Sequence, residues 1–177
     1  MLIGHAPAGY LITKLFISKI PLKLVKQIGG GRLLLVGILS SLMLDLDLLY
    51  FYTFDGRQHA HHSYWTHIPL YWFCILLVPT ALSFALRNAT MAAYSAVISI
   101  NVFAHLLLDT VVGKIMWLYP LSTRNIALFN VPFVYNRWIY NFVFHWSFLL
   151  EITLVMIAVY YMVKPKIPQG IHKLAES

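Results

Sequence analysis

Charged side chains are scarce in this sequence. Only 11% of the residues are Asp, Glu, Lys or Arg, whereas about 25% is usual in soluble domains. Hydrophobic residues make up 60% of the chain, and the mean hydropathy is +0.73. This composition excludes an ordinary soluble enzyme and predicts an integral membrane protein embedded in a lipid bilayer.

Cysteine is nearly absent too. With Cys74 as the single cysteine, the chain can form neither an internal disulfide nor a cysteine-rich zinc site. Any metal must therefore be held by nitrogen and oxygen. The formal net charge is +7, but the basic residues lie between apolar runs and form no stripe with interleaved aromatics. A nucleic-acid partner is therefore not expected.

The apolar runs predict one all-α domain over residues 1–177, a polytopic bundle of about four transmembrane helices plus a short N-terminal helix. Residues 1–32 would contain that helix (about Ala6 to Ile20) and a basic, flexible connector. Residues 33–163 would form the bundle, and the basic tail 164–177 is expected to be disordered. The expected spans are Leu33–Phe51, Ile68–Leu86, Met91–Gly113 and Ile139–Val163.

Half of the eight histidines lie in residues 57–67, RQHAHHSYWTH. Neutral imidazole is the commonest metal ligand in proteins, so His59, His61, His62 and His67 together suggest a metal site. The alternative is a solvated polar loop between two membrane spans. The rare polar residues inside the spans favour the metal site.

Two expected spans contain carboxylates, which are costly in a membrane and therefore mark candidate functional sites. Asp45 and Asp47 are two residues apart and would point to nearly opposite sides of a regular helix. Either the helix loosens there or only one of them binds directly. In the third span Asn101, His105 and Asp109 share one helical face, with a structural hydrogen-bonded pair as the alternative. His145 and Glu151 in the last span are weaker candidates.

The distribution of Lys and Arg predicts which side of the membrane this site faces. If the first span starts in the cytoplasm, nine of the thirteen basic residues are cytoplasmic. The two aspartates, the histidine segment, His105, Asp109 and His145 then all lie near the outer face. His5 is the exception, because it reaches this face only if the N-terminal helix also crosses the membrane or the whole orientation is inverted.

The order of these polar motifs resembles that of a known family, the YdjM-like inner-membrane proteins. The resemblance covers roughly residues 1–122 and rests on His5, LMLDLD (42–47), HSYWTH (62–67), HLLLD (105–109), Gly113 and Tyr119-Pro120. These proteins are described as membrane-bound metal-dependent hydrolases, some of them LexA-regulated or LexA-binding. Leu44, Leu48, Ser63, Tyr64 and Ile68 depart from the family pattern, which implies a changed pocket or a divergent branch with extra histidines at 59 and 61.

The resemblance implies a hydrolase in a prokaryotic inner membrane that uses one or two divalent ions, with zinc preferred and Mn or Fe as alternatives. A weaker likeness to the zinc-dependent phospholipase C and single-strand nuclease group suggests a phosphoester substrate, such as a phospholipid or a lipid-linked phosphate. Asp45 or Asp47 would act as general base or bridge two metals, and Arg57, Arg124 or Arg137 would bind the phosphate. The implied metal ligands are His5, Asp45, Asp47, His59, His62, His67, His105 and Asp109, with His61, His145 and Glu151 as additional candidates.

Two other functions remain open from the sequence. A non-catalytic metal-binding membrane protein would have every coordination position filled by protein, whereas an enzyme would keep one open. A transporter or proton relay would also use intramembrane Asp and His. The sequence has no visible inverted repeat, and its polar groups gather at one end of the spans, which favours an enzyme.

Overall fold

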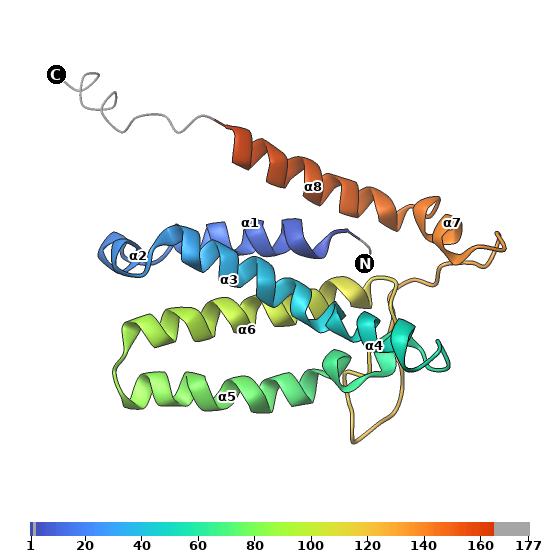
Figure 1. Cartoon of the computed structure of the whole chain (residues 1–177), viewed down its shortest axis with the longest axis horizontal. Coiled ribbons are helices and arrows are strands. Elements are labelled where there is room, and N and C mark those ends of the chain that lie inside the picture. Colours follow the sequence, from blue (N-terminus) through green and yellow to red (C-terminus); the bar gives the residue numbers. More distant parts are fainter. Residues whose placement is uncertain (2, 165–177) are drawn as a thin grey trace.

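The computed structural model describes residues 1 and 3–164, and these form a helical protein (Figure 1). The expected all-α fold is confirmed, because the only strand-like pairing in the described part is an isolated bridge between Ile115 and Ile126. The disorder expected for the tail, residues 164–177, concerns residues outside the described part except for Lys164. The helices are α1 (His5–Ile17), α2 (Leu22–Ile28), α3 (Gly30–Leu42), α4 (Asp47–Thr53), α5 (Pro69–Ala85), α6 (Ala89–Thr110), α7 (Trp138–Val143) and α8 (Ser147–Val163).

The centre of the bundle is the packing of α1, α3 and α6 against one another, with α5 beside α6 and α8 along α1 (Figure 1). Small residues let α1 and α3 approach closely. A Cβ added to Gly37 would lie 1.8 Å from the Thr13 hydroxyl, and one added to Gly9 would lie 2.2 Å from the Ser41 hydroxyl. The glycines of these two helices therefore fix how α1 lies on α3.

Apolar side chains cover the outside of the bundle, while polar ones are buried inside. On α5 and α8, Val78, Phe84 and Leu149 are each about two-thirds exposed or more, whereas His105 and Asp109 in α6 are buried. This arrangement suits a lipid solvent. By length and composition, two helical stretches of the described chain can cross a membrane, Gly30–Thr53 and Ala89–Thr110. The apolar helices α5 and α8 have 17 residues each, so four full spans are not established.

The structure corrects three local expectations. The connector is not simply flexible, because residues 22–28 form α2 and Gly29, at φ +90°, makes the turn into α3. The expected last span is interrupted at residues 144–146, so α7 and α8 are separate helices. The interruption is stabilised by His145, whose Nδ1 is 2.8 Å from the Ser147 hydroxyl at the start of α8. The N-terminal helix ends at Ile17, before the expected Ile20.

Candidate metal centre

Five histidines and three aspartates meet at one end of the bundle. They come from the start of α1, the junction of α3 and α4, the turns before α5, and the last part of α6. The helix does loosen at the aspartate pair, because Met43–Leu46 form a 3₁₀ turn between α3 and α4. This turn allows both Asp45 and Asp47 to face the histidines.

The first group of ligand atoms is formed by His5, Asp45, His105 and Asp109. His5 Nε2 lies 3.1 Å from Asp109 Oδ1, and His105 Nε2 lies 3.0 Å from Asp109 Oδ2. The two imidazole rings stack at a centroid distance of 3.6 Å. Asp45 closes the group at 4.0 Å from His5 and 3.7 Å from His105. Ligands about 2.1 Å from a tetrahedral zinc ion would be roughly 3.4 Å apart, so these spacings fit one ion.

The second group is formed by His61, His62 and His67 in the two 3₁₀ turns before α5. His67 joins the groups, because its Nε2 lies 3.4 Å from His105 Nε2 and 3.6 Å from Asp109 Oδ2. His62 Nε2 is also 3.6 Å from Asp109 Oδ2. Gly113 makes room for His62, since a Cβ at that position would lie 2.6 Å from the imidazole Cε1.

Hydrogen bonds fix which nitrogen of His67 and His105 faces the centre. His105 Nδ1 lies 2.7 Å from the Ser41 carbonyl oxygen, and His67 Nδ1 lies 2.9 Å from Asp47 Oδ2. Because each Nδ1–H donates outward, each Nε2 points its lone pair inward, as metal-binding histidines do. Thr66 also donates to Asp47, so Asp47 supports imidazoles instead of joining the first group.

Asp109 gives the clearest sign that the donors fit a cation. Its side chain is completely buried, and Oδ2 makes no hydrogen bond among the described residues although three imidazole nitrogens lie within 3.6 Å. Because His105 and His67 direct lone pairs at this oxygen, electron-rich atoms face one another. A divalent ion between them would turn this repulsion into coordination. The other oxygen, Oδ1, pairs with the amino group of Met1 as well as with His5.

The two neighbouring histidines outside the membrane helices differ in charge. Burial lowers the pKa of His61, but its contacts with Asp45 and Asp47 outweigh burial and raise the pKa to about 9. Burial lowers the pKa of His62 to about 3, against the attraction of Asp109. His62 is therefore neutral near pH 7 and can donate its lone pair to a metal, whereas His61 is held as a cation by the two carboxylates.

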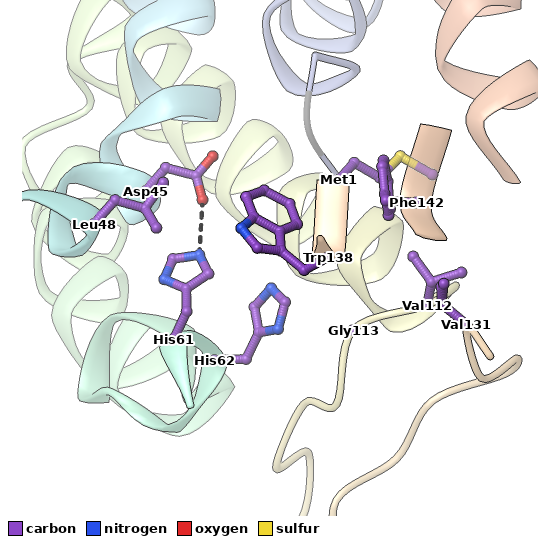
Figure 2. Close-up of a pocket in the computed structure, with 10 residues that line it drawn as sticks. All are labelled: Met1, Asp45, Leu48, His61, His62, Val112, Gly113, Val131, Trp138 and Phe142. Carbon is purple, nitrogen blue, oxygen red and sulfur yellow. Dashed lines mark hydrogen bonds and ion pairs between the residues drawn. The ribbon is translucent and has the colours of Figure 1, made fainter. Parts of the chain in front are cut away.

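A cavity of about 230 Å³ lies directly beside the cluster (Figure 2). Asp45, His61 and His62 face it from one side, and His61 Nε2 lies 3.3 Å from Asp45 Oδ1. Trp138 and Phe142 of α7 enclose it from another side. The cluster is thus accessible to a small ligand through Asp45 and the two histidines.

Several residues proposed from the sequence lie away from the cluster. The side chain of His59 is 65% exposed and pairs with Asp55 at 2.6 Å. His145 contacts Ser147, and Glu151 accepts the backbone N–H groups of Ile3 and Gly4 at 2.5 and 2.9 Å. Glu151 therefore positions the segment before His5, and it belongs to neither of the two groups of ligand atoms.

The three candidate arginines also lie elsewhere. Arg57 lies over the Tyr52 ring, and Arg124 and Arg137 are exposed in or beside the connector before α7. None of the three lines the cavity. Binding of a phosphate by these arginines has no support in this geometry.

Sequence reasoning missed the residues that hold the cluster in place. Thr66 donates to Asp47 and is itself positioned by Trp72, whose indole Nε1 donates to the Thr66 carbonyl at 2.7 Å. The Ser41 carbonyl orients His105. Only Thr66 could have been recognised from the sequence, because it is a polar residue next to His67. A backbone carbonyl or a distant tryptophan has no sequence pattern that would indicate such a role.

Comparison with known proteins gives one family match. The profile of a family described as YdjM inner membrane protein matches residues 1–170 of the 177. No curated protein matches the chain, and no solved structure does so either.

Proposed function

This chain belongs to the YdjM inner membrane protein family, and we propose that it is a membrane-bound, metal-dependent hydrolase of phosphoesters. The observation that carries the proposal is the convergence of histidines and aspartates around Asp109 Oδ2, a buried acceptor without a hydrogen bond among the described residues. Burying this many ionisable groups in an apolar bundle is costly, so a function for them is expected.

The first ion would be held by His5, His105 and Asp109, and its fourth position, beside Asp45, would be open to water. A second ion, if two are bound, would be held by His62 and His67, and by His61 once that imidazole loses its proton. Asp109 lies between the two groups of ligand atoms, because its Oδ1 is next to His5 and its Oδ2 is within 3.6 Å of His62, His67 and His105. Nitrogen and oxygen donors suit zinc, and they also accommodate Mn or Fe. A bound Zn²⁺ lowers the pKa of water to about 7 and polarises a phosphoryl oxygen.

The two aspartates of the α3–α4 junction have different roles in this proposal. Asp45 is partly exposed and lines the cavity, so it can accept a proton from the attacking water or contact the substrate. Asp47 is buried against His61, His67 and Thr66, so it orients imidazoles. We therefore assign the base to Asp45 and the positioning role to Asp47.

We propose that the protein crosses the inner membrane with the cluster at the outer face. The basic residues Lys23, Lys26 and Arg87 lie around α2 and the α5–α6 turn, at the end of the bundle opposite the cluster (Figure 1). The 17-residue helices α5 and α8 rise about 26 Å each, which approaches the hydrocarbon thickness of about 30 Å. Four crossings by α3–α4, α5, α6 and α8 are therefore feasible. Because α1 packs along α3 and starts at the cluster end, it would enter the membrane from the outer face, and His5 then shares that face.

The test is metal content together with turnover in gently purified protein. Wild type should retain at least one transition-metal ion by elemental analysis, and His62→Ala combined with His105→Ala should lose it. His145→Ala is the matched control, because His145 lies outside the cluster. Wild type without metal after zinc addition would reject the site.

For turnover, Asp109→Asn removes the charge at the centre while keeping the side-chain shape, so hydrolysis of a phosphoester panel should be lost. Equal activity of wild type and Asp109→Asn would refute hydrolysis at this site. Metal retained without any turnover would leave a metal-binding protein. Circular dichroism and thermal unfolding in detergent check that the variant is folded.

A further inference from the structure

The cavity beside the cluster has one polar and one apolar side. Asp45, His61 and His62 form the polar side, with Leu48 beside Asp45 (Figure 2). The rest of the lining is Met1, Val112, Gly113, Val131, Trp138 and Phe142. None of the described lining residues is a lysine or an arginine, and the basic groups of the lining, the Met1 amino group and the His61 imidazole, are both paired with carboxylates of the cluster. A highly charged, water-soluble substrate would therefore meet mostly hydrocarbon beyond the cluster.

The apolar side is held in place by a buried asparagine. Asn141 lies between Trp138 and Phe142 on α7, and its Oδ1 accepts the backbone N–H groups of Val134 and Tyr135 at 2.7 and 2.6 Å. Its amide also donates to the Tyr135 carbonyl at 2.8 Å. Trp138 nevertheless remains 56% exposed, so a preformed aromatic surface is available to a ligand.

The surroundings of this wall are apolar too. Phe133, Val134 and Phe144 are 79%, 69% and 71% exposed, which is typical of a surface in contact with lipid. The cavity volume of about 230 Å³ leaves room for a phosphate group and the carbons next to it.

We propose that the ligand of this cavity is a lipid-like phosphoester taken from the bilayer, whose carbons next to the ester pack against Trp138 and Phe142. The inference rests on the proposed function for the position of the phosphate at the cluster. It narrows the substrate to phosphoesters with an alkyl chain and adds two residues that determine specificity. The remainder of the alkyl chain stays outside the cavity, in the lipid.

The experiment measures binding of two non-hydrolysable probes to the zinc-supplemented, full-length protein in nanodiscs. Methylphosphonate and octylphosphonate carry the same head and differ only in the alkyl chain. Isothermal titration calorimetry gives the ratio of their dissociation constants for wild type and for Trp138→Ala, Phe142→Ala, Trp138→Phe and Phe144→Ala. Because the nanodisc lipid is the same throughout, partition of octylphosphonate into it cancels between variants.

Wild type should bind octylphosphonate at least about tenfold more tightly, and Trp138→Ala and Phe142→Ala should each reduce that preference roughly fivefold. Trp138→Phe keeps an aromatic wall and should retain most of the preference. Phe144→Ala, outside the cavity lining, should leave it unchanged. An unchanged preference in both alanine variants, equal affinity of wild type for the two probes, or binding of neither would overturn the inference.

The outcomes separate this inference from the proposed function. Selective octylphosphonate binding without hydrolysis of any phosphoester would support the lipid site and refute the hydrolase. Metal-dependent hydrolysis of soluble phosphoesters, with no preference for octylphosphonate over methylphosphonate, would support the hydrolase and refute the lipid site. Trp138→Phe also shows whether loss in Trp138→Ala comes from the missing ring or from a disturbed α7.

Discussion

Replacing Asp47 with asparagine tests whether this carboxylate positions imidazoles or binds metal itself. In the structure Asp47 Oδ2 is 2.9 Å from His67 Nδ1 and also accepts from Thr66, while Oδ1 is 2.9 Å from His61 Nδ1. An asparagine has one oxygen and one NH₂ group, so either orientation places an NH₂ against an imidazole Nδ1. The substitution is nearly isosteric but makes one of these contacts a clash of donors.

The consequence for His67 can be worked out from its tautomer. If the NH₂ group faces His67, Nδ1 must become the acceptor, and the proton moves to Nε2. That nitrogen faces His105 and Asp109, so His67 could no longer offer a lone pair to the centre. If the NH₂ group faces His61 instead, His67 keeps its tautomer but loses the negative charge behind it.

We expect Asp47→Asn to weaken zinc binding by about 10- to 100-fold, the usual effect of losing such a supporting carboxylate. This equals about 1.4 to 2.7 kcal/mol. Competition with a zinc chelator in detergent measures the affinity, and thermal unfolding without metal measures the fold. Asp55→Asn is the matched control, because Asp55 pairs with the exposed His59 and lies outside the cluster.

Two results would refute the reasoning. Zinc affinity equal to wild type would mean that Asp47 does not support His67. A loss as large as that of Asp109→Asn would mean that Asp47 is itself a ligand. An intermediate loss, with Asp55→Asn unchanged, is the expected result.

Three further predictions concern the bundle and its surface. Gly37→Ala should destabilise the protein by about 1–3 kcal/mol, because the added Cβ would overlap Thr13 of α1. Gly31→Ala is the control, because a Cβ there has open space around it and should leave the stability unchanged. Thermal unfolding in detergent compares the two variants. In a cysteine-free background, Arg57Cys and Arg87Cys, at opposite ends of α5, should be labelled from opposite sides of the membrane, and labelling from one side would contradict a crossing. Hydrogen bonds from His59 lower the pKa of Asp55 to about 2. The ionised Asp55 carboxylate should therefore stabilise the protein fully above pH 4, and this stabilisation should be lost as the pH falls through 2. A ¹³C NMR titration of the Asp55 carboxyl carbon measures this pKa.

Periodic patterns in the sequence were sufficient for α5, α6 and part of the cluster. The apolar runs predicted α5 and α6 to within a few residues, and the spacing of His105 and Asp109 placed both on the buried face of α6. The two-residue spacing of Asp45 and Asp47 predicted either a loosened helix or a single direct ligand, because a regular helix cannot direct both to one side, and the structure shows the loosened helix. These features depend on local geometry, which the sequence encodes directly.

Features set by tertiary packing were not predictable in the same way. His5 was left on the wrong side under the favoured topology, yet the close contact of Gly9 and Gly37 aligns α1 with α3 and brings His5 to the cluster. In the histidine segment no periodicity distinguishes His59 from His61. Two 3₁₀ turns direct His61 inward, while Asp55 holds His59 outside.

The arrangement of lone pairs is the strongest physical argument for a cation at the centre. Outward hydrogen bonds commit the Nδ1 protons of His67 and His105, so their Nε2 atoms face Asp109 Oδ2 and Asp45 Oδ1 at 3.0 to 3.8 Å as acceptors facing acceptors. One proton can relieve one such pair, and protonating both imidazoles would set two cations 3.4 Å apart. A single divalent ion relieves all of these contacts at once, because the donor atoms converge on it from different helices. Metal binding therefore follows more directly from this geometry than any particular reaction does.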